Sequence, residues 1–287
     1  MQNYIIAADS ACDLPEDIIK KFDIKIIPYE LTFDGENYIN SLNLDLNYFY
    51  QEIRSGKLPK TTQINSTRFF EYFEQFLKKG LDVIFIGLSS ALTGTYSPLN
   101  IAVKELKEVY KNNKVIVIDS LSASLGQGML ICEACEKRAQ GYPIEKLEQW
   151  LNEKKYKIYH IFTVNDLFHL KRGGRISSSA AIIGSMLSIK PLLKINDEGA
   201  LEVAGRGRGR RASMLALINN MKENISKENN DTIFIAHADC YEDAKLLASE
   251  IKIRLKINNI IIGEIGPIIG THAGAETLAI LYWAEKR

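Results

Sequence analysis

Short runs of β-branched residues alternate with amphipathic segments along most of this chain, and this alternation is the feature that most constrains its fold. Runs such as residues 83–88 and 114–119 are apolar on both faces, which is typical of strands in a sheet that is covered on both sides. The segments between such runs carry apolar residues at helical spacing. Strands that alternate with helices predict an α/β protein with largely parallel sheets.

Two domains are expected from the length of 287 residues. The predicted strands lie at residues 4–8, 24–33, 83–88, 114–119, 157–163, 232–237 and 260–264. A charged stretch at residues 152–157 separates a predicted helix from a new strand. We therefore expect one α/β domain at residues 1–156 and a second at residues 157–287, each with a largely parallel sheet.

The overall charge argues against nucleic acid as the main partner. Lys and Arg number 36 against 35 Asp and Glu, so the chain has no global basic field. The apolar run near the N-terminus ends at Asp9, which is not the pattern of a signal peptide. No segment approaches the roughly 20 apolar residues of a membrane span. We expect a cytoplasmic protein without stable membrane insertion.

The four cysteines do not predict a redox or metal site. Cys132 and Cys135 form a C-x-x-C pair, but the surrounding segment has a helical pattern that places both thiols on one face. No second cysteine pair or histidine pair completes a tetrahedral zinc site. The favoured interpretation is that both thiols are structural.

Hydroxyl-rich loops follow three of the predicted strands, at residues 9–10, 89–95 and 120–124. Ligands in open α/β sheets bind where strands lead into helices, and free helical N–H groups beside hydroxyls attract anions. For any single loop, helix capping is the favoured interpretation. Several such loops at one sheet edge favour a site for a small oxyanion.

Two histidines compete for a role at this site. His272 lies in the segment GTHAG, which we expect to precede an apolar helix. His237 is at the end of a predicted strand, close to Asp239. Either ring could donate a hydrogen bond to an anion, although a lone histidine is more often structural.

The basic runs at residues 172–175 and 206–211 leave a nucleic-acid alternative open, since glycine-spaced arginines can contact phosphates. The second run is short and lacks interleaved aromatic residues, so a solvated turn or an arginine that reaches an anion is favoured. No Walker A, H-E-x-x-H or G-x-S-x-G motif is present, and we find no metal-binding cluster. These observations favour a binding protein over an enzyme, with a phosphotransferase for a small anionic substrate as the alternative.

An ordered set of segments resembles the DegV family over nearly the whole chain. The segments are IIAADSACDLP, KTTQIN, SSALTGTY, VIDSLSASLGQG, LKRGGRIS, KPLLKINDEG and GTHAG. The family includes the fatty-acid-binding subunit of bacterial fatty acid kinase. The resemblance implies a two-domain carrier that holds one long-chain fatty acid between its domains and needs no cofactor or metal. It also implies that the catalytic subunit of the kinase phosphorylates the bound acid for phospholipid synthesis.

The resemblance also assigns roles to individual residues. It implies that the carboxylate is bound by hydroxyls, a histidine and an arginine, at Thr61, Thr62, Thr93, Gly94, Arg208 and His272. Arg206 competes with Arg208 for the arginine position. Arg172 and Arg175 match a turn that the resemblance places against the kinase. We expect residues 180–187 and Phe69, Phe70 and Phe73 as candidate walls of the acyl tunnel, although core packing explains each of them individually.

Overall fold

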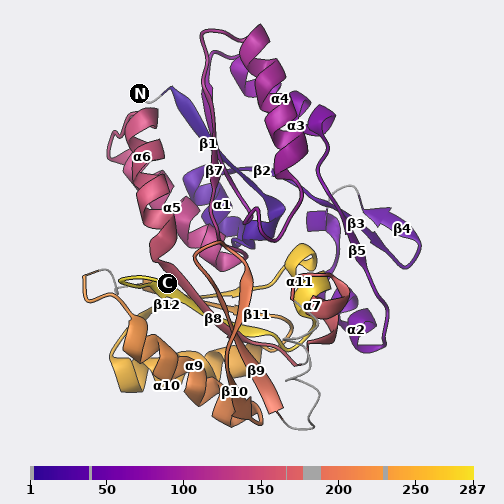
Figure 1. The fold of residues 1–287 in the computed structure, drawn as a ribbon, viewed down its shortest axis with the longest axis vertical. Helices are drawn as coiled ribbons and strands as arrows, with labels where there is room; N and C mark the ends of the chain where they lie inside the picture. Colours follow the sequence, from indigo (N-terminus) through magenta and orange to yellow (C-terminus); the bar gives the residue numbers. More distant parts are fainter. Residues whose placement is uncertain (1–2, 39–40, 166, 177–188, 229–231) are drawn as a thin grey trace.

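The computed structural model describes residues 3–38, 41–165, 167–176, 189–228 and 232–287 (Figure 1). Its strands form two large sheets and one small sheet, and helices cover the large sheets. The candidate tunnel wall at residues 180–187 lies outside the described residues. The α/β fold class predicted from the sequence is confirmed.

The first large sheet is entirely parallel, as predicted. Its strand order is β2-β1-β6-β7. The strands are β1 (Tyr4–Asp9), β2 (Lys25–Ile27), β6 (Asp82–Gly87) and β7 (Val115–Asp119). Every residue of β1 is buried, which agrees with a strand covered on both faces. The carboxyl ends of β1, β6 and β7 therefore meet at one edge of this sheet.

Helices pack on both faces of the first sheet. They are α1 (Glu16–Phe22), α3 (Ser66–Leu77), α4 (Tyr96–Val109), α5 (Leu125–Ala139) and α6 (Ile144–Lys154). The side chain of Asn65 caps α3 by accepting a hydrogen bond from the Arg68 N–H. Phe69 and Phe73 are fully buried against Phe85 of β6. These rings belong to the core, so the candidate assignment of Phe69, Phe70 and Phe73 to a tunnel wall is wrong.

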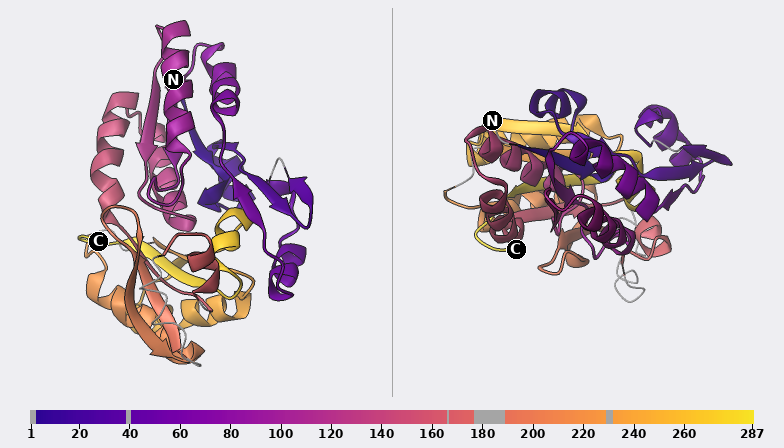
Figure 2. Two further views of the ribbon diagram at one scale, coloured as in Figure 1. Left: turned by 45° about the vertical axis from the view of Figure 1, so that its right-hand side comes forward. Right: turned by 90° about the horizontal axis from the view of Figure 1, so that it is seen from above.

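The small sheet arises because the predicted strand at residues 24–33 is interrupted at Pro28, which has no backbone N–H to continue a ladder. The chain leaves β2 and forms β3 (Glu30–Phe33), which pairs with β4 (Glu36–Tyr38) and β5 (Lys60–Thr62). Helix α2 (Leu46–Arg54) lies between β4 and β5 in the chain. Figure 2 shows this antiparallel sheet extending away from the main body of the molecule.

The second large sheet is mixed, which differs from the parallel sheet that the sequence predicted. Its order is β10-β9-β8-β13-β11-β12, and among these described strands only β11 and β12 pair in parallel. The strands are β8 (Ile158–Thr163), β9 (Ile189–Ile195), β10 (Leu201–Arg208), β11 (Thr232–His237), β12 (Asn259–Glu264) and β13 (Leu278–Trp283). The antiparallel pairs arise because β9 and β10 form a hairpin and β13 inserts between β8 and β11.

The segment after GTHAG is β13, and the helix predicted there is wrong. Leu278 to Leu281 pair with both neighbouring strands and are buried, so a continuous apolar run here marks a central strand. GTHAG itself ends the short helix α11 (Pro267–Ala273). The remaining helices of this half are α7 (Phe168–Arg172), α9 (Arg210–Asn224) and α10 (Tyr241–Leu255).

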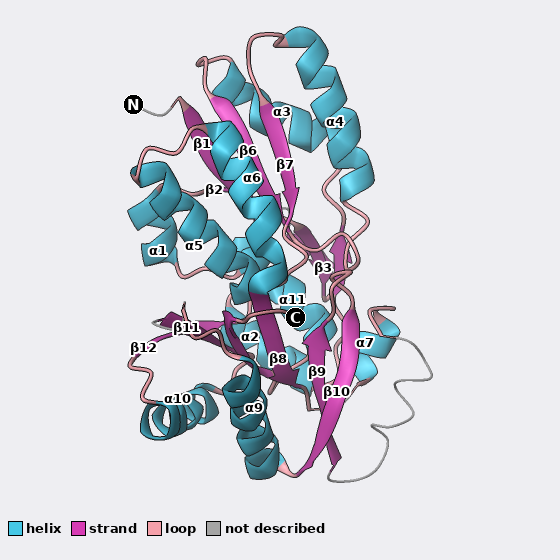
Figure 3. Ribbon diagram, turned by 60° about the vertical axis from the view of Figure 1, so that its left-hand side comes forward, coloured by secondary structure: helices cyan, strands magenta, loops and turns pink. Residues whose placement is uncertain are grey.

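Helix α5 joins the two large sheets. It packs on the first sheet and also reaches β8 and β11 of the second, while α9 and α10 cover the opposite face of the second sheet (Figure 3). A Cβ atom at Gly126, in the first turn of α5, would overlap the ring of His160 on β8. A Cβ atom at Gly263 would lie 2.9 Å from Leu125. The two large sheets are therefore joined closely through α5, while the domain boundary at residues 156 and 157 stays a prediction.

Candidate ligand-binding site

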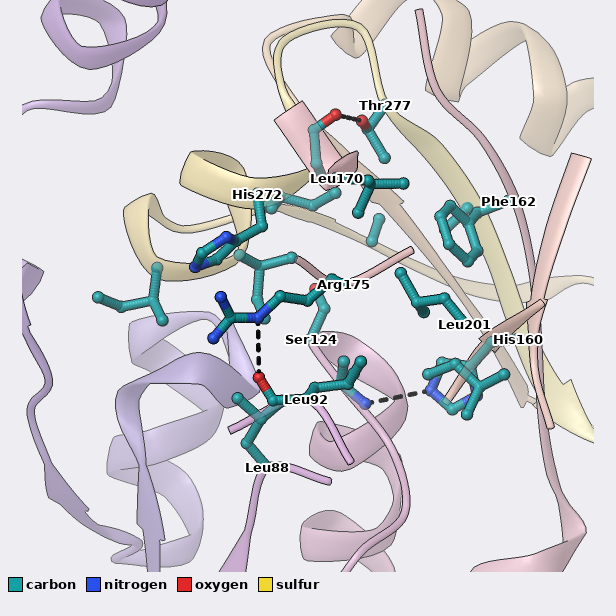
Figure 4. A pocket seen from close by; sticks show the side chains of 18 of the residues that line it. Leu88, Leu92, Ser124, His160, Phe162, Leu170, Arg175, Leu201, His272 and Thr277 are labelled. Atoms are coloured by element: carbon teal, nitrogen blue, oxygen red, sulfur yellow. Dashed lines mark hydrogen bonds between the residues drawn. The ribbon is translucent and has the colours of Figure 1, made fainter. Parts of the chain in front are cut away.

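An apolar cavity lies where the two large sheets meet (Figure 4). Both halves of the chain contribute to its wall, which is mostly aliphatic. Apolar members from both halves include Leu88, Leu92, Phe162, Ile268, Ala279 and Leu281. Such a cavity suits an apolar ligand, because removal of each CH₂ group from water contributes about 0.8 kcal/mol.

Polar side chains gather at one end of the cavity, which we call the mouth. Thr61 of β5 and His272 of α11 lie 3.1 Å apart, measured from Oγ1 to Nε2. Thr93, in the loop after β6, lies 2.8 Å from the hydroxyl oxygen of Thr95. The Tyr29 hydroxyl lies 3.3 Å from the Thr93 oxygen and donates to the Thr95 oxygen at 3.2 Å. The mouth thus presents hydroxyls and an imidazole, which are neutral donors.

His272 is uncharged at neutral pH. Burial and the nearby positive charges of Arg175 and Arg172 lower its pKa to about 4. Its Nδ1 atom is buried and has no hydrogen-bond partner within the described ranges. A side chain at Gly173 would overlap this nitrogen, so the glycine allows α7 to pack closely on α11. A neutral ring can donate one hydrogen bond to an anion without adding a buried charge.

The two arginines of the basic turn occupy different positions. Arg175 is partly buried and lines the cavity, where its Nε donates to the Leu92 carbonyl at 3.1 Å (Figure 4). Arg172 is exposed and lies in the polar opening outside the mouth. The resemblance implied a partner surface for both, whereas the structure places Arg175 in the wall of the cavity.

The polar opening outside the mouth, which we call the vestibule, is continuous with the cavity. Tyr29, Thr61, Thr93, Arg175 and His272 line both spaces. The vestibule adds hydroxyl, amide and cationic groups, at Lys60, Thr62, Gln63 and Arg172. It therefore resembles an approach route for a charged group more than a place for an apolar chain.

Three of the residues predicted for ligand binding do not contact the cavity directly. Thr62 is exposed and lines only the vestibule. Gly94 lines neither space; a Cβ there would collide with the Gln63 side chain, so its role is to let the two loops approach closely. Arg208 is exposed at the end of β10, and neither Arg208 nor Arg206 lines the cavity or the vestibule.

Most hydroxyls in the loops after the parallel strands are used internally. Ser10 accepts a hydrogen bond from the Tyr29 N–H, and Ser120 accepts one from the Ser122 N–H. Asp9 accepts from the N–H groups of Ala11 and Leu88. Asp9 caps the short helix at Ser10–Cys12, so capping explains the first loop, whereas Thr95 and Ser124 make no capping hydrogen bond to α4 and α5. Thr93 lines both the cavity and the space outside its mouth.

Tyr29 is the site residue that sequence reasoning missed. It follows Pro28 within the predicted strand at residues 24–33, so its pattern indicated strand packing. The interruption at Pro28 brings the ring to the mouth, where it is buried. Burial raises its pKa, which keeps the hydroxyl protonated and able to donate. A proline inside a predicted strand was the signal that could have indicated this position.

The remaining candidates are structural. His237 is buried with its ring 5.5 Å from that of Tyr241, and it does not line the cavity. Cys132 and Cys135 are free thiols on α5, and burial raises the pKa of each to about 12. No group of three metal-ligating side chains occurs in the part of the chain that the structure describes. Among those same residues, no helix is both long and apolar enough to span a bilayer.

Comparisons with known proteins agree with this geometry. The profile of a family of uncharacterised proteins, DegV, matches residues 4–285. A DegV domain-containing protein of Clostridium perfringens is 41% identical over 289 residues, which cover 100% of this chain and 99% of the relative.

Solved structures extend the comparison to bound ligands. The crystal structure of DegV from Bacillus subtilis, described as a fatty acid binding protein, matches with a TM-score of 0.85 and 29% identity, covering 99% of this chain and 100% of that one. A stearic acid-binding protein from Eubacterium ventriosum matches with a TM-score of 0.87 and 25% identity, covering 97% and 98% of the two chains.

Proposed function

The chain belongs to the DegV family, and from this premise we propose that it binds a long-chain fatty acid in the cavity between its two large sheets. The carboxylate would lie at the mouth, against Thr61, Thr93 and His272, with the tail along the apolar wall. The observation that carries the proposal is a mostly apolar cavity whose mouth holds the hydroxyls of Thr61 and Thr93 and the neutral imidazole of His272.

Energetics support this orientation of the ligand. A carboxylate without hydrogen bonds is expensive to bury, and hydroxyls with a neutral imidazole can satisfy its oxygens. Arg175 supplies a nearby positive charge, although part of its donor capacity is already used by the Leu92 and Gly173 carbonyls. The tail contributes about 0.8 kcal/mol for each buried CH₂ group, so a long chain can be held without a covalent bond.

The cavity must widen to accept a long chain. Its volume is about 100 Å³, which is below the roughly 300 Å³ at which ligand pockets usually begin. Its walls are largely Leu, Ile and Ala side chains, which can move apart by rotamer changes. We therefore propose that the aliphatic walls separate as the tail enters.

We also propose that a separate ATP-dependent kinase phosphorylates the bound acid. The vestibule supports this role, because its hydroxyls and cations lie where a phosphoryl group would have to approach the carboxylate. Arg172, exposed in the vestibule, is our candidate for contact with the kinase, and Thr62 for alignment of the head group. On this proposal the chain is a non-catalytic carrier that acts in the cytoplasm.

Mass spectrometry of the purified protein tests the ligand. Under native conditions we expect a bound mass equal to that of a fatty acid, and organic extraction should release the same acid. A protein that carries no lipid and does not bind added hexadecanoic acid would exclude the proposal. ATP turnover by this chain alone would favour the alternative, a phosphotransferase that uses the basic vestibule for a small anionic substrate.

A further inference from the structure

A turn of the second large sheet joins two residues that line the cavity on the side away from the mouth. Ile195, at the end of β9, and Leu201, at the start of β10, both line the cavity. In Figure 4, Leu201 and His160 lie on the side opposite His272 and Arg175. We call residues 196–200, which connect the two strands, the floor turn.

The floor turn has a defined shape. The Gly199 N–H donates to the Asn196 carbonyl at 2.9 Å, and the Asn196 N–H donates to the Ala200 carbonyl at 2.9 Å. The Asn196 side-chain oxygen accepts a further bond from the Ala200 N–H at 2.9 Å. Gly199 has a φ of +80°, a conformation that glycine adopts readily. The turn is therefore preorganised by its own hydrogen bonds.

Two loops of the first sheet hold the floor turn in place. The Ser89 hydroxyl, in the loop after β6, donates to the Gly199 carbonyl at 2.8 Å. A Cβ at Gly199 would overlap that hydroxyl and would lie 3.1 Å from the side chain of Leu121, in the loop after β7. The turn thus sits directly against the opposite half of the molecule, with no room for a larger residue.

Arg287 also binds at the contact between the floor turn and the loops of the first sheet. Its guanidinium donates to five acceptors, which are the carbonyls of Leu121 (2.6 Å), Lys155 (2.7 Å), Ile158 (2.9 Å) and Asn196 (3.3 Å) and the hydroxyl of Ser122 (2.9 Å). No carboxylate is among its hydrogen-bond partners within the described ranges. The planar fork of an arginine can satisfy so many acceptors at once, whereas a lysine cannot.

The acceptors of Arg287 adjoin the cavity wall. Ser122 precedes Ala123, Asn196 follows Ile195, and Ile158 is two residues before His160, and all three of these neighbours line the cavity. The Ala123 N–H in turn donates to the His160 ring at 3.4 Å. A movement of Arg287 would therefore release the floor turn and the wall residues on both sides of it.

We infer that Arg287 determines which acyl-chain length the cavity prefers, because it fixes the floor turn against the loops after β6 and β7. The inference rests on the proposed fatty-acid function. A tail that reaches Ile195 and Leu201 can extend further only if the floor turn that joins them moves away, and the five hydrogen bonds of Arg287 oppose that movement. Arg287 is thus a positioning residue that acts through the floor turn and does not itself need to touch the ligand.

The test compares binding of dodecanoic, tetradecanoic, hexadecanoic, octadecanoic and eicosanoic acids to the full chain. The variants are Arg287→Met, which keeps length and loses all donors, and Arg287→Lys, which keeps the charge. Exposed Lys286→Met is the matched control. We expect Arg287→Met to move the preferred length upward by about two carbons. The ratio of long-chain to short-chain affinity should rise roughly tenfold, the factor that two further buried methylenes supply.

If Arg287→Met does not fold, Ser89→Ala also loosens the floor turn, because it removes the hydrogen bond to the Gly199 carbonyl. It should shift the preferred chain length in the same direction by a smaller factor. Arg287→Lys should lie between wild type and Arg287→Met. An unchanged preferred length in the folded variants, or a loss of affinity equal for all chain lengths, would overturn the inference and leave the proposed function standing. A wild-type protein that binds none of the five acids would overturn both.

Discussion

Tyr29 and its hydroxyl neighbours determine how the mouth of the cavity can bind an anion. The Tyr29 hydroxyl contacts Thr93 and Thr95, and the Thr61 hydroxyl contacts His272. This trio of hydroxyls and the Thr61–His272 pair contain no carboxylate, so a ligand carboxylate would meet these neutral groups and the guanidinium of Arg175. Hydrogen bonds from neutral groups also leave the oxygens of a bound carboxylate more nucleophilic than a bidentate ion pair with an arginine would.

Removal of the Tyr29 hydroxyl tests this arrangement. We expect Tyr29→Phe to weaken fatty-acid binding roughly five- to tenfold, because it removes one network hydrogen bond worth about 1 kcal/mol. The ring remains in the core, so the melting temperature should change little. Titration calorimetry with hexadecanoic acid measures the effect, and Tyr48→Phe, at a ring 38% exposed, is the control. Equal affinities for the two variants would remove Tyr29 from the site.

At the scale of elements, the parallel first sheet could be predicted from the sequence and the second could not. Strands with β-branched residues on both faces, such as β6 and β7, were located to within one residue at each end. The sequence predicts a helix where β13 lies, because the periodicity of a short apolar run does not distinguish a central strand from a buried helix. The partners of such a run lie far away in the chain, so local pattern cannot reveal them.

The candidate site could also be predicted only in part from the sequence. Thr61, Thr93 and His272 come together as the family resemblance implied, although each stands on a different element. Arg208 does not reach the cavity because the strand β10 carries it to the exposed face. Tyr29 and Arg287 were missed because their importance depends on contacts across more than sixty residues of chain.

The close contact between the elements α5 and β8 leads to a prediction about stability. A methyl group at position 126 has to displace the His160 ring, and overpacking of this kind costs about 1–3 kcal/mol. We expect Gly126→Ala to lower the melting temperature by several degrees, as thermal unfolding would measure. Gly205→Ala is the control, since nothing lies within 4 Å of a Cβ there. A Gly126→Ala variant as stable as this control would contradict the close packing of α5 on β8.

At the scale of the whole molecule, a buried carboxyl connects the two halves. Asp13 accepts a hydrogen bond from the Ser124 hydroxyl at 2.5 Å, and its other oxygen faces Gly266, which precedes α11 in the second half. Burial raises the pKa of Asp13 to about 7 from an ordinary value of 3.8. The folded protein therefore favours the protonated form. This contribution to stability is complete below pH 3.8 and is lost as the pH rises to about 7.

Asp13→Asn removes the charge and keeps the shape. We expect the variant to gain stability over wild type as the pH rises from 4, reaching about 4 kcal/mol near pH 8, because the pKa is raised from 3.8 to about 7. Chemical denaturation at pH 4.5 and pH 8 measures the difference. Asp17→Asn, on the exposed face of α1, is the matched control. A constant difference between Asp13→Asn and wild type across this range would show that Asp13 does not titrate there.

The place of β13 in the second sheet has a consequence for biosynthesis. It follows β12 in the chain, yet it lies between β8 and β11, where it contributes Ala279 and Leu281 to the cavity wall. During translation, β8 and β11 must wait unpaired on their inner edges until residues 278–283 leave the ribosome. The cavity should thus form only after β13 has been synthesised, and a nascent chain stalled before β13 should expose apolar surface to chaperones.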